Sequence, residues 1–247
     1  MLKEIVITIQ SWGQAHRFII QHKLWKWVII PGLIYAAMFV AAMYFFGKSA
    51  TAVIDYVTYN LHLDDWSQKF RNSFLGFIFT FGGIIFWLTL LLFYFSFFKY
   101  IILIIGSPIF AYLSRKTESI IENNENIRKW SGIRKEAGRA VKMALRNCGW
   151  QTVYLIAFLI LSLIPVIGWI TPLIVLFVEC YYYGFAMLDY GLARNDYSGS
   201  ESIYFNGRHK GLAMGNGILF YLMHVLIFFA PAYAIIAGTL TVHQVKK

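Results

Sequence analysis

One stretch of this sequence, from Asn147 to Val178, contains no Asp, Glu, Lys or Arg. About 20 consecutive apolar residues suffice to cross the hydrocarbon core of a bilayer as a helix, so the run is long enough for a membrane segment. The run is interrupted, however, by Pro165, Gly168 and Pro172. A proline inside a helix removes an amide donor and clashes with the preceding turn. The sequence therefore predicts two helical arms that reverse at these three residues.

The composition agrees with an all-α integral membrane protein that forms a single membrane domain over residues 1–247. Hydrophobic residues make up 59% of the chain and charged residues only 14%, which is more apolar than a soluble domain requires. The two cysteines, Cys148 and Cys180, form no disulfide framework and are predicted to be free thiols. The sequence contains no phosphate loop, nucleophile elbow or metal-ligand cluster, so neither an enzyme nor a bound cofactor or metal is predicted.

The net charge of +10 is distributed in a way that indicates a membrane surface. Between Arg115 and Arg146 there are nine Lys or Arg residues and four Glu residues. No base-reading motif accompanies this charge, which argues against a nucleic-acid partner. We expect residues 115–146 to form a basic helical segment on the anionic cytoplasmic leaflet.

Two further uncharged runs, residues 27–47 and 72–98, are each long enough to cross the bilayer as a transmembrane helix. Basic residues dominate before the first run and after the second. The connecting residues 48–71 hold three basic and three acidic residues. Because basic residues concentrate in cytoplasmic loops, the sequence predicts that both termini are cytoplasmic and that this connection lies outside.

The remaining apolar regions, residues 151–190 and 212–245, are expected to form helical hairpins. In the first, the arm before Pro165 would be about 21 Å long, which is short for a full span. Pro231 divides the second region into arms of roughly 21–24 Å. Polar or basic residues flank both regions. We expect both hairpins to enter the bilayer halfway from the cytoplasmic side, and four tilted full spans are the alternative.

The hairpin tips place a condition on their surroundings. Backbone groups at a tip inside the membrane must be buried in protein or line a wet cavity, so another hairpin, another subunit or a water-filled path should lie beside the break.

Two amphipathic surface helices are also expected. Residues 2–20 carry apolar side chains at helical spacing before the first span, and residues 51–70 are similar on the outer side.

Polar residues within the apolar regions are the first candidates for function. Glu179 and His224 lie at membrane depth, where ionisable side chains normally face the protein interior or a cavity. Glu179 either lines a pathway, forms a structural hydrogen bond with a tyrosine or arginine, or reaches the interface. A structural role is favoured for His224. Arg194 and Arg208, which follow the first hairpin, complete this set of pathway or structural residues, whereas Lys99 is expected to extend its amine to the interface.

The start of the first span is a candidate anion-binding site formed by Lys23, Leu24, Trp25 and Lys26. The first amides of a helix lack intrahelical partners and coincide there with the positive end of the helix dipole. The two lysines would add positive charge to this end. An alternative role for the lysines and tryptophans is to anchor the helix at the interface.

Several motifs follow one another along the chain. GSPIFAYLSRKTE occupies residues 106–118 after the second span, and MLDYGLAR closes the first hairpin at residues 187–194. Gly215, Pro231 and the sequence AGTLT at residues 237–241 come later. In this order the motifs resemble the CysZ family of bacterial sulfate permeases, which is related to the etoposide-induced membrane proteins of eukaryotes. The resemblance covers nearly the whole chain.

The resemblance implies a helical protein of the bacterial inner membrane with two long membrane helices and two half-inserted helix pairs. It also implies a homo-oligomer and passive entry of sulfate for cysteine synthesis. In that family a Gly-Leu-Arg motif at the start of the first long helix helps to bind sulfate. By position the motif falls here on residues 23–25, where only Leu24 matches. Lys26 is the candidate to replace the lost positive charge.

Two functions remain open at this stage. The first is a channel or permease for sulfate or a similar small oxyanion. The second is a membrane scaffold or bilayer-shaping protein that transports nothing, since hairpins wedged into one leaflet could bend it. Polar residues that converge on a path would favour transport. A charged Glu179 in the narrow part of such a path would repel sulfate unless it were protonated, paired or displaced from the path.

The predicted orientation can be tested by thiol labelling of intact cells. In a background without Cys148 and Cys180, single cysteines would replace Asp64, Ser131 or Ser200. A membrane-impermeant reagent should label only the cysteine at position 64. Labelling of position 200 from outside would contradict the paired-hairpin arrangement.

Overall fold

A computed structural model describes most of the chain. Of the described residues 94% are helical, and none belongs to a strand. This confirms the prediction of an all-α fold. The description covers residues 1–60, 74–123, 130–162, 164, 167–223 and 229–246.

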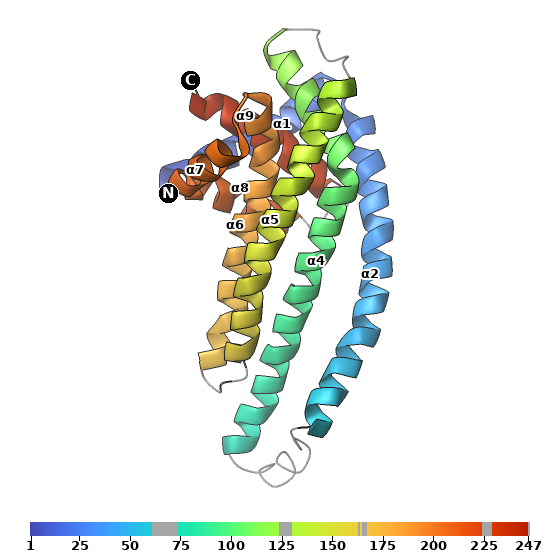
Figure 1. Cartoon of the computed structure of the whole chain (residues 1–247), viewed down its shortest axis with the longest axis vertical. Coiled ribbons are helices and arrows are strands. Elements are labelled where there is room, and N and C mark those ends of the chain that lie inside the picture. The colour runs from blue at the N-terminus through green and yellow to red at the C-terminus, as the bar shows by residue number, and fades with distance from the viewer. Residues whose placement is uncertain (61–73, 124–129, 163, 165–166, 224–228, 247) are drawn as a thin grey trace. The chain divides into compact units, whose positions relative to one another are not determined.

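Contacts between residues divide the chain into two compact units. Unit 1 comprises residues 1–37, 99–149 and 179–247, and unit 2 comprises residues 38–98 and 150–178. Four helices, α2, α4, α5 and α6, contribute residues to both units. The helices labelled in Figure 1 are α1 (Leu2–Gln21), α2 (Trp25–Asn60), α4 (Phe74–Ile121), α5 (Trp130–Ser162), α6 (Thr171–Arg194), α7 (Gly199–Arg208), α8 (Lys210–Met223) and α9 (Ala230–Lys246).

Among the described residues, four helices are long and apolar enough to cross a membrane, and they lie within α2, α4, α5 and α6. The helices α2 and α4 extend well past the expected spans 27–47 and 72–98. An uncharged run marks where a helix is apolar, whereas Lys48 and Lys99 interrupt the run without interrupting the helix. For the same reason residues 51–60 belong to α2 and not to a separate surface helix; residues 61–70 lie outside the described residues.

The basic segment expected at 115–146 is not one helix. Residues 115–121 end α4, residues 130–146 begin α5, and residues 124–129 lie outside the described part. Consequently the first hairpin arm is not the short helix expected from residue 151. It is part of α5, whose 33 residues would extend about 50 Å at 1.5 Å per residue. This length fits the alternative of a full span, and half insertion of the hairpins stays a prediction.

The predicted helix break is present. The helix α5 ends at Ser162, a 3₁₀ turn (η1) follows at Ile167–Ile170, and α6 begins at Thr171. Pro172 lies in the first turn of α6, where no amide donor is needed. The N–H of Gly168 donates to the carbonyl of Ile164 at 2.8 Å. A side chain at Gly168 would overlap the backbone of Ser162, so the reversal requires glycine there, while Pro165 lies outside the described residues.

The second hairpin also forms close to its predicted position. The two arms are α8, with 14 residues, and α9, with 17 residues. Pro231 is the second residue of α9, which agrees with the tolerance of proline in a first helical turn. Residues 224–228 between the arms lie outside the described part.

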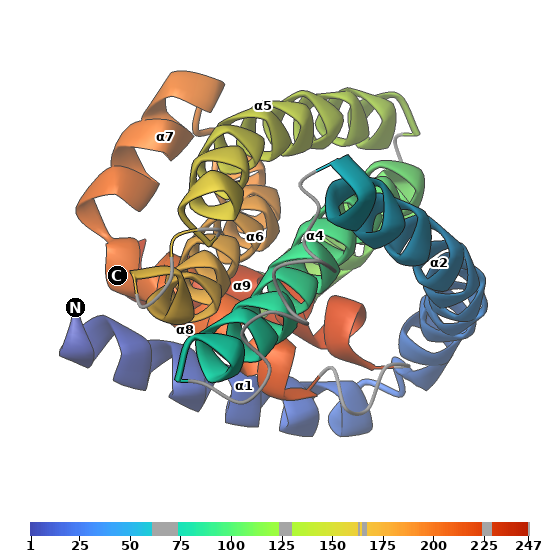
Figure 2. The same cartoon turned by 90° about the horizontal axis from the view of Figure 1, so that it is seen from below.

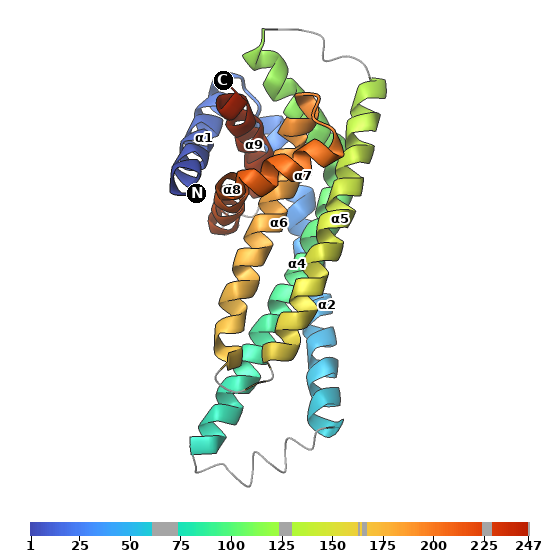
Figure 3. The same cartoon turned by 60° about the vertical axis from the view of Figure 1, so that its left-hand side comes forward.

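The described part of unit 2 contains segments of α2, α4, α5 and α6 that lie side by side in Figures 1 and 3, together with the turn η1. Aromatic contacts join them. The ring of Phe46 lies 5.1 Å from that of Tyr94, between centroids, and the rings of Phe81 and Trp169 are 5.5 Å apart. A buried hydrogen bond of 2.6 Å joins Gln151 to Ser96, which satisfies two polar groups inside an apolar bundle.

In unit 1, α1 packs along α8 and α9, as Figures 2 and 3 show. The contact is partly polar, because the indole N–H of Trp12 donates to Asn216 at 2.7 Å and the Asn216 amide donates to the carbonyl of Ala234 at 3.3 Å. The predicted helix 2–20 is confirmed, and its buried stripe covers the second hairpin. The apolar side chains Val6 and Ile9 remain exposed on α1, so this helix has a second apolar face.

A close helix contact in unit 1 joins α6 to α8 through glycines. A Cβ atom at Gly217 would overlap the carbonyl of Cys180, and one at Gly184 would overlap the carbonyl of Ala213. Backbones that approach this closely leave no room for any side chain. In membrane proteins generally, small residues at helix interfaces allow the backbones to approach closely.

We expect Gly217→Ala to destabilise the protein. The added methyl group meets rigid backbone, and overpacking of this kind costs about 1–3 kcal/mol, which exceeds the gain of at most about 1 kcal/mol in helix propensity. Thermal unfolding in detergent would measure the change. The matched control is Gly13→Ala, because nothing lies within 4 Å of a Cβ atom at Gly13. Equal unfolding midpoints for the two variants would contradict the close packing of α6 against α8.

Candidate functional site

Two opposite charges are buried together in unit 1. The side chain of Lys99, on α4, is 2% exposed and that of Glu179, on α6, is 0% exposed. The Lys99 amine contacts the Glu179 carboxylate, and the hydroxyl of Tyr221 on α8 donates to the same carboxylate oxygen. The amine also lies over the rings of Tyr221 and Tyr183, 4.2 Å and 5.7 Å from their centroids. The expectation that Lys99 reaches the interface is therefore wrong, because an acidic partner and two aromatic rings hold it inside.

The pairing answers one question that the sequence raised about Glu179. Its negative charge is compensated by Lys99, and its hydrogen bond comes from a tyrosine, Tyr221. A paired carboxylate repels a passing anion far less than an isolated one. The pathway role of Glu179 stays a prediction.

From Lys99 towards the C-terminal end of α4, buried polar side chains continue along one face of the helix. Lys99, Ser107, Ser114 and Glu118 are all at most 3% exposed, and their spacings of about two turns or one turn place them on the same side of the helix. We call these four residues the polar stripe. From Lys99 to Glu118 the stripe extends about 29 Å at 1.5 Å per residue.

The polar stripe contacts α9 at two points. The hydroxyl groups of Ser114 and Thr239 are 2.9 Å apart, and Nδ1 of His243 lies 3.5 Å from a Glu118 carboxylate oxygen. The hydroxyl of Ser107 donates to the carbonyl of Ile104 in its own helix at 2.9 Å. The polar stripe thus contacts side chains of three other helices, α6, α8 and α9.

A second ionic group surrounds Glu136 on α5. Arg115 donates two N–H groups to its carboxylate at 2.7 Å and 3.0 Å, a two-pronged geometry that fixes orientation as well as distance. Arg194, one of the predicted polar residues, lies 3.7 Å from the same carboxylate. Glu136 therefore joins α4, α5 and α6 at one point.

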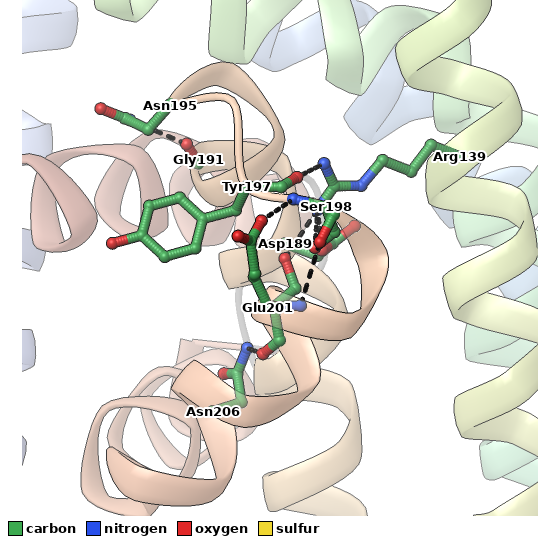
Figure 4. Close-up of polar contacts among 9 residues, drawn as sticks. Arg139, Asp189, Gly191, Asn195, Tyr197, Ser198, Glu201 and Asn206 are labelled. Atoms are coloured by element: carbon green, nitrogen blue, oxygen red, sulfur yellow. Dashed lines mark hydrogen bonds and ion pairs between the residues drawn. The ribbon is translucent and has the colours of Figure 1, made fainter.

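A third group ties α5 to the start of α7, and Figure 4 shows its contacts. Arg139 donates to Asp189 at 2.9 Å, to the Ser202 hydroxyl at 2.6 Å and to the backbone carbonyl of Tyr197. Ser198 caps α7 and forms a reciprocal capping box with Glu201. The pKa of the Glu201 carboxyl is lowered, mainly by the hydrogen bond from the Ser198 backbone N–H and secondarily by the Ser198 side chain.

The predicted anion-binding residues lie where α1 turns into α2. Leu24 is fully buried, whereas Lys23, Trp25 and Lys26 are exposed. Lys23 has a positive φ of 52°, so it forms the turn between the helices. The helix α2 begins at Trp25, so its start lies beside both lysines, but the N–H groups of Leu24 and Trp27 already donate to the carbonyls of Ile19 at 3.0 Å and Leu24 at 2.9 Å. Anion binding there stays a prediction.

A third lysine, on α4, lies close to this junction. The amine of Lys116 is 5.7 Å from the centroid of the Trp27 ring. Arg208 is separate from all these groups, since it is exposed at the end of α7 and its guanidinium donates to the Tyr204 hydroxyl at 3.3 Å. His224 lies outside the described residues.

Sequence reasoning missed most of the buried partners. Lys99 was expected at the interface because it ends the uncharged run 72–98, and Glu118 and Arg139 were expected at the surface because they lie in the charged stretch 115–146. A signal was available on α4, where polar residues recur about every seven positions within an apolar run. That period marks one helix face and would have placed Lys99, Ser107 and Ser114 in the interior.

These observations define a class: a polytopic α-helical membrane protein that buries charged residues among its apolar helices. The chain matches the family model described as Sulfate transporter CysZ/Etoposide-induced protein 2.4 over residues 11–237, and it belongs to this family, as the motif order suggested. None of the curated proteins matches the sequence.

The buried ion pair can be tested by removing one charge or both. Glu179→Leu strands the Lys99 charge and should destabilise the protein by about 3–5 kcal/mol, whereas Lys99→Met/Glu179→Leu together should recover most of this loss. Thermal unfolding in detergent would measure both. Lys48→Met is the matched control, because Lys48 is exposed and should have little effect. A double variant no more stable than Glu179→Leu would contradict the pairing.

Proposed function

We propose that this protein is a channel or permease for sulfate or a similar small oxyanion in the cytoplasmic (inner) membrane of a cell, with both termini cytoplasmic. The observation that carries the proposal is the polar stripe on α4, in which Lys99 and Glu118 are buried within a helix apolar enough to cross a membrane. Such residues are costly at membrane depth and usually mark the route of a polar solute.

The family points in the same direction. The description of the family names a sulfate transporter, and a sulfate ion needs polar groups to replace its hydration as it crosses. The hydroxyl groups of Ser107 and Ser114 could donate hydrogen bonds to an oxyanion if they exchanged their present acceptors, the Ile104 carbonyl and the Thr239 hydroxyl, for the ion. The proposal assigns them that part.

Charge complementarity supports an anion over a cation. The carboxylates Glu179, Glu136 and Asp189 each contact a lysine or arginine. Glu118, in the polar stripe, lies 3.5 Å from His243, so its charge is compensated when His243 is protonated. At the junction of α1 and α2, Lys23 and Lys26 are exposed beside the positive end of α2, and Lys116 lies close to Trp27. Weak attraction at an entrance and compensated charge inside allow an ion to bind and also to leave.

Flux of radiolabelled sulfate into proteoliposomes tests the proposal, with and without a pH gradient to detect proton coupling. The parent protein should admit sulfate faster than protein-free liposomes. An absence of flux from correctly folded protein would overturn the proposal and favour the scaffold or bilayer-shaping alternative.

The entrance site can be tested by sulfate calorimetry on purified protein. Lys23→Gln/Lys26→Gln should weaken binding about threefold to thirtyfold, since each charge near an exposed helix end contributes roughly 0.3–1 kcal/mol. Trp25→Arg adds a positive charge and should bind at least as well as the parent. The matched control is Lys3→Gln/Lys48→Gln, which removes the same charge from other exposed positions. Equal binding by the two double variants would mean that Lys23 and Lys26 serve only as anchors.

A further inference from the structure

A separate cleft in unit 1 lies between the first half of α5 and the start of α7. Its volume is about 590 Å³. The residues that line it include five with cationic side chains and, within the described part of the chain, none with a carboxylate. We call it the basic cleft, and its cations are Arg134, Lys135, Arg139, Lys142 and Arg146.

Two of the five cations have structural partners that shape the basic cleft. Arg139 holds the start of α7 against α5 through the Ser202 hydroxyl and the Tyr197 carbonyl. It also pairs with Asp189 on α6, as Figure 4 shows. Arg146 donates to the side chain of Asn147 at 3.0 Å and lies over the Phe185 ring, 5.8 Å from its centroid. Arg139 and Arg146 therefore stabilise the walls of the cleft, and the remaining cations are the candidates to bind a ligand.

The other three cations, Arg134, Lys135 and Lys142, are exposed. None of them has a hydrogen-bond or ion-pair partner among the residues that the structure describes. Ser200 and Gly199 begin α7 opposite them, and the first amides of a helix also attract anions. The basic cleft therefore presents uncompensated positive charge to an anionic ligand that comes from outside the chain.

The sequence of α5 locates the basic cleft at the membrane surface. Arg146 is the last charged residue of the helix, and no charge follows before Glu179. Leu145 and Trp150, at the end of the basic part, are 55% and 52% exposed. Exposed tryptophan next to an apolar helix is typical of the level where lipid headgroups begin. Lys142 is about 12 Å from Trp150 along the helix, beyond a headgroup layer of roughly 5–7 Å, so its long side chain would reach back to the headgroups.

We propose that the basic cleft binds the phosphate headgroup of an anionic phospholipid. A phosphodiester accepts hydrogen bonds from the guanidinium of Arg134 and from the amines of Lys135 and Lys142, and its acyl chains enter the bilayer along the apolar part of α5. Basic pockets beside membrane helices bind such headgroups by this chemistry. The site is distinct from the junction of α1 and α2, and the inference does not depend on sulfate transport.

Native mass spectrometry of the full-length protein in detergent tests the proposal, with phosphatidylglycerol and phosphatidylcholine added at equal concentration. The parent should retain phosphatidylglycerol preferentially. Arg134→Gln/Lys135→Gln/Lys142→Gln should bind it about a hundredfold more weakly, since each basic residue near an anionic surface contributes about fivefold. Lys142→Gln alone should lose about fivefold, which provides a milder variant if the triple variant folds poorly.

The matched control is Lys3→Gln/Lys48→Gln/Lys210→Gln, which removes the same net charge from exposed positions outside the cleft. This control should retain phosphatidylglycerol like the parent. Three results would overturn the proposal: equal retention by the cleft variant and the parent, equal loss in the control, or displacement of the lipid by inorganic phosphate at the same concentration, which would indicate a site for free anions.

Discussion

Lys99 and Glu179 carry opposite charges into helices that are apolar enough to cross a membrane, and their side chains are at most 2% exposed. Leaving either charge alone in such surroundings would cost several kcal/mol. Each charge must therefore remain in contact with the other, and Tyr221 adds a hydrogen bond from α8. These contacts fix the positions of α4, α6 and α8 relative to one another within unit 1.

The same requirement organises the rest of unit 1. Arg115 and Arg194 converge on Glu136, and Arg139 satisfies Asp189 while it holds the first turn of α7. Charges paired in this way rigidify the helices that carry them. Cations without such partners lie at the surface, both where α1 meets α2 and in the basic cleft. Interior carboxylates paired with lysine or arginine, as at Glu179, Glu136 and Asp189, and unpaired cations at the surface are what passage of an anion and attachment to anionic lipid would require.

The two helix breaks were predictable because proline acts through its own backbone. Pro172 and Pro231 each lie in the first turn of a helix, and Gly168 stands where any side chain would meet backbone. Helix lengths were not predictable from uncharged runs. Lys99 illustrates why: a charged residue ends an apolar run, but it does not end a helix when a partner on another helix receives its charge.

The sequence by itself determined that this chain is an all-α membrane protein of its family, because apolar runs, prolines and motif order are local properties. It also located the lysines at the start of α2, since a helix end and its neighbours are close in sequence. Only the tertiary structure decided the partners of Lys99, Glu118 and Arg139. Each partner lies 50 or more residues away along the chain, and no local pattern specifies which distant charge will meet it. The basic cleft has the same origin, since it exists only where α7 packs against α5.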